Sequence, residues 1–301
     1  MKDFRQKITF VYAYENEKWS TPMALANEFR RIGWEVEFVS IGSNGTGQYH
    51  DRDLQLWIQQ DTPSNIVLFM DWGRFDSKWL DRTLKPNTYW IQESGDDPQN
   101  FERNYPKSER FNLTLSPDFE SSKEYRKRNQ DSAWWTHFAD TAVQYPMDIQ
   151  EEYVAVTTRG RGNSQFLDQL TAHSDGEVGN QNGFDAPQHT EFLNKGMMVV
   201  QNSRWGEVTR RIFEGMACGK MVLCDRLHEN KKLHELFIDG EDIVYYDDMI
   251  DCINKMNKYR EDSTERERIA KNGYNKVLEN HTQKQRVEFI IEKYKEWKNF
   301  Q

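Results

Sequence analysis

Short runs of apolar residues alternate with longer polar stretches along the first half of the chain. Brief runs rich in β-branched and aromatic residues are typical of strands that are buried in a sheet. They predict strands at 8–13, 36–39, 66–70, 88–91 and 111–115. A helix is predicted between the first two strands, because Ser20 and Pro22 form a start signal and Gly33 forms a stop signal. Strands separated by helices predict βαβ units and a parallel sheet.

The second half of the chain repeats this alternation. Strands are predicted at 154–158, 197–200, 221–224 and 243–246. The tail over 263–300 consists almost entirely of helix-forming residues, with an interruption at 281–282. We therefore predict two similar α/β halves, with a boundary near residues 140–150 and a cleft between them.

Composition narrows the class of protein. A length of 301 residues suits two domains, and an aromatic content of 13% excludes a disordered chain. No apolar run approaches the ~20 residues of a membrane span, and the first residues do not resemble a signal peptide, which predicts a cytoplasmic protein. The net charge of −9 weighs against indiscriminate binding to nucleic acid or anionic membranes. The three cysteines are too few and too scattered for a disulfide framework or a zinc site.

The first candidate site lies in the segment 203–220. On a helix, Glu207, Arg211 and Glu214 would share one face, since they are spaced i, i+4 and i+7. The N-terminus of that helix, with Arg210 or Arg211, could hold a diphosphate, and a carboxylate could accept hydrogen bonds from ribose or sugar hydroxyls. The alternative is a solvated Glu–Arg pair worth a few tenths of a kcal/mol, and the spacing alone favours this alternative.

The second candidate site is Arg159, Gly160 and Arg161, directly after the strand predicted at 154–158. Glycine lets the backbone approach a ligand closely, and the two arginines supply charge directed at phosphate. Ligands of open α/β sheets bind at such strand ends. The alternative is an ordinary strand-to-helix turn, and these residues alone leave both interpretations open.

The third candidate site is acidic. Glu93, Asp96 and Asp97 follow the strand predicted at 88–91, where a general base or a polyol-binding group would lie. An acidic turn that only faces solvent is the alternative. No motif typical of a metal site accompanies these residues, so we expect chemistry that needs no bound metal.

Three ordered segments of the second half resemble group-1 glycosyltransferases of the spore-maturation (CgeB-type) branch. They are residues 211–219, 237–246 and 266–273, and the last leads into His281-Thr282 and Arg286. The resemblance implies an α/β fold of the GT-B type, with two Rossmann-like domains whose parallel sheets face a central cleft. It covers about 150–290 well and the first half only loosely.

The resemblance also implies which domain binds the acceptor and which binds the nucleotide sugar. Residues 1–145 form an acceptor-side Rossmann-like domain, and residues 146–301 form a nucleotide-sugar-binding one whose last helix crosses back to the first. Contacts with the donor's ribose or diphosphate are implied at Glu214, Arg211, Arg159 and Gly160. Larger relatives carry two glutamates eight positions apart, whereas Glu207 and Glu214 are seven apart.

The implied activity is transfer of a hexosyl or pentosyl group from a nucleoside-diphosphate sugar to a hydroxyl acceptor, with no metal and no cofactor. The acidic charge suits a glycan, a lipid-linked sugar or a protein as the acceptor. Two alternatives stay open: a non-catalytic nucleotide-sugar-binding protein, and a glycosyltransferase acting on a hydroxymethylated base in DNA. The DNA-modifying alternative would use a cluster of basic residues in the first half, namely Arg103, Lys107, Arg110, Lys123, Arg126, Lys127 and Arg128.

Overall fold

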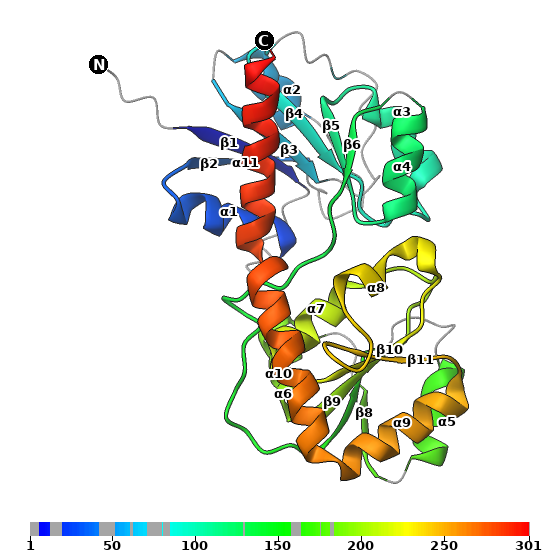
Figure 1. Ribbon diagram of the computed structural model, residues 1–301. Helices are drawn as coiled ribbons and strands as arrows, with labels where there is room; N and C mark the ends of the chain where they lie inside the picture. Colours follow the sequence, from blue (N-terminus) through cyan, green and yellow to red (C-terminus); the bar gives the residue numbers. More distant parts are fainter. Residues whose placement is uncertain are drawn as a thin grey trace. The chain divides into compact units, whose positions relative to one another are not determined.

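The chain folds into two compact units in the computed structural model (Figure 1). The first unit combines Met1–Thr136 with Lys284–Gln301, and the second unit is His137–Gln283. The division after Thr136 lies upstream of the boundary that the sequence predicted at 145/146, and the C-terminal helix is part of the first unit. The structure describes residues 6–12, 20–41, 52–60, 63–70, 80, 85–128, 130–157, 164–174, 176–180 and 184–300.

The first unit contains a parallel sheet whose described strands follow the order β2-β1-β3-β4-β5-β6. Its strands are β1 (Lys7–Tyr12), β2 (Glu35–Ser40), β3 (Ile66–Met70), β4 (Tyr89–Glu93), β5 (Leu113–Ser116) and β6 (Ser132–Trp134). Its helices are α1 (Thr21–Arg31), α2 (Arg52–Gln59), α3 (Phe101–Ser108), α4 (Phe119–Lys127) and α11 (Gln283–Asn299). Strands β3, β4 and β5 are buried along their whole length, as the apolar runs predict.

Helix α1 begins and ends where the sequence signals place it. Ser20 is its N-cap residue and Pro22 lies in the first turn, where a missing N–H costs no helical hydrogen bond. Gly33 follows the helix with a φ of 90°, a left-handed conformation that glycine adopts without a steric penalty.

The second unit contains a parallel sheet with the strand order β11-β10-β9-β7-β8. Its strands are β7 (Tyr153–Val156), β8 (Val178–Asn180), β9 (Gly196–Gln201), β10 (Val222–Asp225) and β11 (Val244–Tyr246). Its helices are α5 (Ser164–His173), α6 (Ala186–Lys195), α7 (Arg210–Ala217), α8 (Leu233–Leu236), α9 (Met249–Glu261) and α10 (Ser263–Asn280).

Both sheets have the same topology. Numbered within its own unit, each reads 2-1-3-4-5 from one edge, and the first sheet adds a sixth strand. The strand order reverses between β1 and β3 in the first unit and between β7 and β9 in the second. In open α/β sheets, ligands bind outside the carboxyl ends of the strands at this point of reversal.

Helices cover both faces of the second sheet, because alternate residues of its strands enter different cores. Val199 packs into a core with residues of α6, α7 and α10, whereas the next residue, Val200, packs into a core with residues of α5 and α9. Strand β10 divides in the same way at Val222 and Leu223. Figure 1 shows α7 and α9 on either side of this sheet.

Aromatic contacts attach α11 to the sheet of the first unit. Tyr294 is buried, and its hydroxyl accepts a hydrogen bond from the side chain of Asn65 at 3.1 Å. The ring of Trp297 stacks on that of Tyr89, with 5.0 Å between centroids. Tyr89 in turn opens β4, so the C-terminal helix is held to a central strand.

The edge strands β6 and β8 are absent from the sequence prediction. Each has three residues and all of them are half-buried, so neither produces an apolar run or a clear alternation. Among the residues that the structure describes, no helix is both long and apolar enough to cross a membrane.

Candidate functional site

The carboxyl ends of β7 and β9 are tied together where the strand order of the second sheet reverses. The Thr157 hydroxyl donates to Oε1 of Gln201 at 2.7 Å, and its backbone N–H donates to the carbonyl of Val200. The Tyr246 hydroxyl, at the end of β11, donates to Oδ1 of Asn202 at 2.9 Å. These contacts fix the strand ends from which the loop before α7 departs.

The loop from Asn202 to Thr209 is held by two carboxylates. Oδ1 of Asp225, the last residue of β10, accepts the backbone N–H of Ser203 at 2.8 Å, and the Ser203 hydroxyl donates to Oδ2. Oε2 of Glu207 accepts the backbone N–H of Trp205 at 2.7 Å. Gly206 has a φ of 67°, so the turn between these residues requires the freedom of glycine.

Glu207 lies in this loop and not on the helix that the sequence predicted for it. Helix α7 begins at Arg210, so Glu207, Arg211 and Glu214 do not share one helical face. The helical spacing fails here because the chain turns at Gly206 before the helix starts. Burial raises the pKa of the Glu207 carboxyl, and the nearby charge of Asp225 adds to this effect.

The N-terminus of α7 carries a buried hydroxyl that has no hydrogen-bond partner among the residues that the structure describes. Thr209 is the N-cap residue, it is 7% exposed, and its side chain makes no capping hydrogen bond. The first N–H groups of a helix lack intrahelical acceptors and carry the positive end of the helix dipole. Thr209 therefore adds a further donor at a place that already favours an anion.

Two glycines set the position of α7. A Cβ atom at Gly215 would lie 3.1 Å from Val222 and 3.2 Å from Val199, so the absence of a side chain brings the helix close to the sheet. Gly219 follows the helix with a φ of 72° and allows the chain to turn directly into β10. The helix N-terminus is thereby placed beside the carboxyl ends of β9 and β10.

Glu214 lies one helical turn into α7 and contacts two basic side chains. Nε of Arg210 is 2.8 Å from Oε1 of Glu214. Nε2 of His189, on α6, is 3.3 Å from Oε2 of the same carboxylate. The Glu214 side chain is only 11% exposed, and that of His189 only 12%.

Glu214 stays ionised in spite of its burial. Burial on its own would raise the pKa of this carboxyl, because a charge is costly to remove from water. The charge of Arg210, the contact with His189 and the charge of Arg211 outweigh that cost and hold the pKa well below its ordinary value. An ionised carboxylate accepts hydrogen bonds only, so Glu214 is prepared to receive hydroxyl groups.

Asp140 contributes a second carboxyl beside Arg210. It is 6% exposed, and burial raises its pKa, whereas the Arg210 charge opposes that rise. Its Oδ1 accepts the backbone N–H of Ala142 at 3.0 Å. Neither Asp140 nor His189 is among the residues that the sequence singled out, since each lies far along the chain from Glu214 and belongs to no motif.

Of the other residues predicted to contact the sugar donor, the structure describes Arg211 and does not describe Arg159, Gly160 and Arg161. Arg211 lies at the start of α7, is half-buried, and its charge acts on Glu214. Arg159, Gly160 and Arg161 lie outside the described residues. The strand that precedes them in the sequence, β7, lies at the point where the strand order of the second sheet reverses.

The acidic segment after β4 contains one carboxylate, that of Asp97, which is buried and accepts several hydrogen bonds. Asp97 is 4% exposed; its Oδ2 accepts from the hydroxyls of Ser94 and Ser116, and its Oδ1 from the amide of Asn104. Burial raises the pKa of Asp97 to about 6, although these hydrogen bonds favour the ionised form. These contacts indicate that Asp97 holds the loop after β4 against β5 and α3.

The other two acidic candidates of the first unit differ in exposure. Glu93 is buried at 6%, at the end of β4, and Asp96 is exposed and has a φ of 62°. Aspartate tolerates this left-handed conformation better than most residues do. The turn therefore presents Asp96 to solvent while Asp97 points inward.

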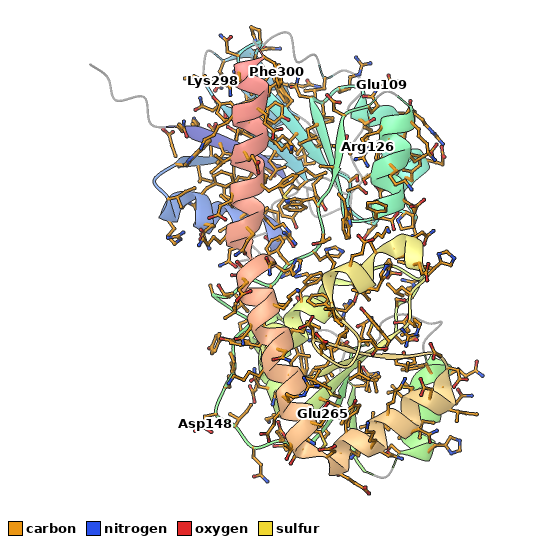
Figure 2. All side chains as sticks on the ribbon, in the orientation of Figure 1. Glu109, Arg126, Asp148, Glu265, Lys298 and Phe300 are labelled. Carbon is orange, nitrogen blue, oxygen red and sulfur yellow. The ribbon has the colours of Figure 1, made fainter. Side chains whose placement is uncertain are left out.

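Three basic residues on and directly after α4, namely Lys123, Lys127 and Arg128, pair with acidic neighbours. Lys123 pairs with Glu120 at 3.0 Å, and Arg128 pairs with Glu124 at 3.0 Å and also with Glu102. Arg126, labelled on α4 in Figure 2, donates to the backbone carbonyl of Ser132. The Arg128 guanidinium also lies over the rings of two aromatic residues, Phe101 and Tyr105.

The second unit has one group of side chains that suits an anion and one that suits a diol. The Thr209 hydroxyl and the helix N-terminus, with Arg211, suit a diphosphate, and the ionised Glu214 suits the vicinal hydroxyls of a ribose. Among the residues that the structure describes, no group of three or more His, Cys, Asp or Glu side chains is arranged as a metal site.

The fold is that of the GT-B glycosyltransferases, which confirms the predicted fold class. Sucrose-phosphate synthase from Thermosynechococcus elongatus matches with a TM-score of 0.70 at 12% identity, over 99% of this chain and 100% of that one. Anabaena HepE, solved with UDP and glucose, matches with a TM-score of 0.68 at 12% identity, over 97% and 100%. A glycosyltransferase from Rickettsia africae matches with a TM-score of 0.66 at 10% identity, over 97% and 98%.

The sequence of the second unit gives a family match. Residues 161–292 match the model of a family described as glycosyl transferase-like. The matched range begins after β7 and extends into α11, so it includes Thr209, Glu214 and the whole of α7. A search of curated proteins finds no match to the chain.

Proposed function

We propose that the protein is a glycosyltransferase that moves a sugar from a nucleoside diphosphate to a hydroxyl acceptor, without a bound metal. The observation that carries this proposal is the arrangement at α7, where an ionised, buried Glu214 follows a helix N-terminus with a buried, unpartnered Thr209 hydroxyl. The glycosyl transferase-like match over 161–292 includes this helix. Within this class, the three motifs at 211–219, 237–246 and 266–273 favour the CgeB-type branch.

In this proposal the N-terminus of α7 and Glu214, one turn further along the helix, bind different parts of the donor nucleotide. Glu214 accepts hydrogen bonds from the ribose hydroxyls, and the diphosphate lies against the Thr209 hydroxyl, the first N–H groups of α7 and Arg211. Arg159, Gly160 and Arg161 are proposed to complete the diphosphate contacts from the loop after β7. Structural neighbours that contain UDP, or UDP-glucose in a further complex of Anabaena HepE, support a nucleotide of this kind.

The transfer step breaks the bond between the anomeric carbon and the β-phosphate oxygen of the donor. The acceptor oxygen forms the new bond to that carbon, and the nucleoside diphosphate leaves with the electron pair. Negative charge develops on the leaving oxygen, so fixed positive groups stabilise the transition state. The helix N-terminus and Arg211 are proposed to supply that charge, while Arg210 forms an ion pair with Glu214.

The acceptor must also lose a proton. For an inverting reaction, we propose Asp96 as the base among Glu93, Asp96 and Asp97, because Asp96 alone of the three is exposed. Asp97 directs both of its oxygens at internal donors and so supports the same turn. A retaining reaction would need no such base.

A glycan, a lipid-linked sugar or a protein is the proposed class of acceptor. A DNA acceptor would need a strip of basic side chains that are available to phosphates, since phosphate contacts dominate affinity for DNA. Lys123, Lys127 and Arg128 already pair with Glu120, Glu124 and Glu102, which offsets part of the charge of the basic cluster. These pairs support the first class of acceptor over DNA.

Binding of nucleoside diphosphates tests the proposal. Isothermal titration calorimetry with UDP, GDP and dTDP should show binding of at least one of them to the wild-type protein. Glu214→Gln should weaken that affinity by about 10-fold or more, since hydrogen bonds to charged groups are worth roughly 1.5–3 kcal/mol. The matched control is Glu265→Gln on α10, a half-buried glutamate that pairs with the exposed Arg268 (Figure 2).

The outcomes separate the candidate functions. Binding that Glu214→Gln weakens and Glu265→Gln leaves unchanged supports the proposed site. Nucleotide binding without transfer or hydrolysis of any UDP-, GDP- or dTDP-sugar would support the non-catalytic alternative. Equal affinity in the wild type and Glu214→Gln would contradict the assignment of Glu214.

A further inference from the structure

The Glu214 carboxylate is held from two separate helices. Arg210 belongs to α7 and contacts Oε1 at 2.8 Å, whereas His189 belongs to α6 and contacts Oε2 at 3.3 Å. A single cation could neutralise one carboxylate, so charge balance alone does not require both contacts. The second contact has a geometric consequence, because it assigns each oxygen its own partner.

His189 is itself held rigidly on α6. The helix starts with a capping box, in which Asp185 accepts the backbone N–H of Gln188 and the Gln188 side chain accepts that of Asp185. The backbone N–H of His189 donates to the carbonyl of Asp185 at 2.9 Å. The imidazole stacks on Phe192 with 6.1 Å between centroids and an angle of 25°.

A carboxylate offers about four lone-pair positions, two on each oxygen. Arg210 Nε lies 2.8 Å from Oε1 and His189 Nε2 lies 3.3 Å from Oε2, and neither contact has the geometry of a hydrogen bond, so each oxygen of Glu214 keeps lone-pair positions for a ligand. Two hydroxyls on neighbouring carbon atoms match such a pair. Without His189, the planar guanidinium of Arg210 is able to bind both oxygens at once, as arginine commonly does with carboxylates.

We propose that His189 is a positioning residue for the donor, which holds Glu214 so that its two oxygens together receive the 2′- and 3′-hydroxyls of a ribose. The proposal rests on the proposed function, in which Glu214 binds the ribose. His189 does not touch the nucleotide; it acts through Oε2 of Glu214 and prevents a bidentate pair between Glu214 and Arg210.

Other groups around the carboxylate do not replace this contact. Asp140 lies near Arg210, whose charge lowers the pKa of the Asp140 carboxyl. Arg211 acts on Glu214 through its charge. The His189 contact is made to Oε2 and is separate from both of these effects.

The experiment compares a ribonucleotide with the same nucleotide lacking both hydroxyls. Affinities of UDP and 2′,3′-dideoxy-UDP, and of GDP and 2′,3′-dideoxy-GDP, are measured by titration calorimetry for each variant. We expect the wild type to prefer the ribonucleotide that it binds by 10-fold or more, and His189→Ala to reduce that preference to less than about threefold. His189→Gln, which retains a side-chain N–H donor, should restore most of the preference.

Two further variants make the test specific. His189→Phe keeps a ring against Phe192 but has no donor, so it should also lose the preference, even if His189→Ala fails to fold. His173→Ala, an exposed histidine at the end of α5, is the matched control and should keep the wild-type preference.

The results distinguish this inference from the proposed function. If the wild type binds the ribonucleotide with a preference that His189→Ala or His189→Phe retains in full, the role of His189 is contradicted and the nucleotide site stands. If the wild type binds none of the nucleotides, the proposed function fails and the role of His189 fails with it.

Discussion

The half-buried Arg210 and the buried Glu214 form an ion pair one turn apart on α7, with 2.8 Å between Nε and Oε1. The pair joins the helix N-terminus, which suits a diphosphate, to a carboxylate that suits a ribose. Because the two residues belong to the same helix, the distance between the two binding ends is fixed by helical geometry. Helix α7 would therefore hold the proposed diphosphate and ribose sites at a fixed separation. Gly215 allows the helix to lie close to the sheet.

Arg211→Ala should weaken binding of the diphosphate more than binding of the nucleoside. Arg211 is proposed to contact the diphosphate, and an interaction between charged groups of this kind is worth roughly 1.5–3 kcal/mol. The affinity for UDP or GDP should fall about 10-fold or more, while the affinity for the corresponding nucleoside changes less than twofold. Competition binding measures both; equal losses for nucleotide and nucleoside would place Arg211 away from the diphosphate.

Asp97→Asn should remove part of the pH dependence of stability. Burial raises the pKa of Asp97 from 3.8 to about 6, so between these values the folded protein binds more protons at this site than the unfolded chain. The free energy of unfolding should therefore decrease as pH rises from about 4 to about 6 because of this residue. Glu214, whose pKa is lowered, acts in the opposite direction and only at lower pH.

The measurement for Asp97 is urea unfolding of the wild type and Asp97→Asn at several pH values. The difference in unfolding free energy between the two should change by up to roughly 3 kcal/mol across pH 4–6, at 1.36 kcal/mol per pKa unit. All other groups cancel in this difference. A difference that stays constant over that range would show that Asp97 does not titrate there.

Gly273→Ala should destabilise the second unit, although alanine is the better helix former. A Cβ atom at Gly273, within α10, would lie 2.5 Å from the backbone carbonyl oxygen of Asp242. We expect a cost of roughly 1–3 kcal/mol from overpacking, against a gain of about 1 kcal/mol from helix propensity in an unhindered position. Thermal unfolding, with the exposed Lys271→Ala as control, tests the sign; a higher Tm for Gly273→Ala would contradict the close approach.

Tyr294→Ala should loosen α11 from the first unit. Tyr294 is 4% exposed and bonded to Asn65, and removing a buried aromatic side chain costs roughly 3–5 kcal/mol. Tyr294→Phe should cost only about 1 kcal/mol, since it loses one hydrogen bond. Phe300→Ala, at a position that is 90% exposed near the end of the chain (Figure 2), is the control and should leave the unfolding midpoint unchanged.

Much of the fold was predictable because buried parallel strands are uninterrupted apolar runs. The strand predicted at 66–70 is β3 to the residue, and the interruption predicted at 281–282 separates α10 from α11. The short edge strands β6 and β8 were not predictable in this way, since their residues are only half-buried. Pairing with a neighbouring strand, which sequence periodicity does not encode, is what defines them.

The candidate site was predictable only along one segment of chain. The donor roles expected for Glu214 and Arg211 come from the family resemblance, since their spacing alone favoured a solvated ion pair. The spacing also placed Glu207 on the same helix, which is wrong because Gly206 turns the chain before the helix begins. His189 gave no local signal, since its partner is on another helix. Contacts between elements depend on how the elements pack, which the local pattern of one sequence does not predict.

A structure of the protein with a bound nucleoside diphosphate tests the central claim most directly. The account predicts ribose hydroxyls within roughly 3.2 Å of the two Glu214 oxygens, the usual range for hydrogen bonds, and phosphate oxygens at the Thr209 hydroxyl and the N-terminus of α7. A nucleotide bound with its ribose away from Glu214, or with its phosphates away from α7, would contradict the account.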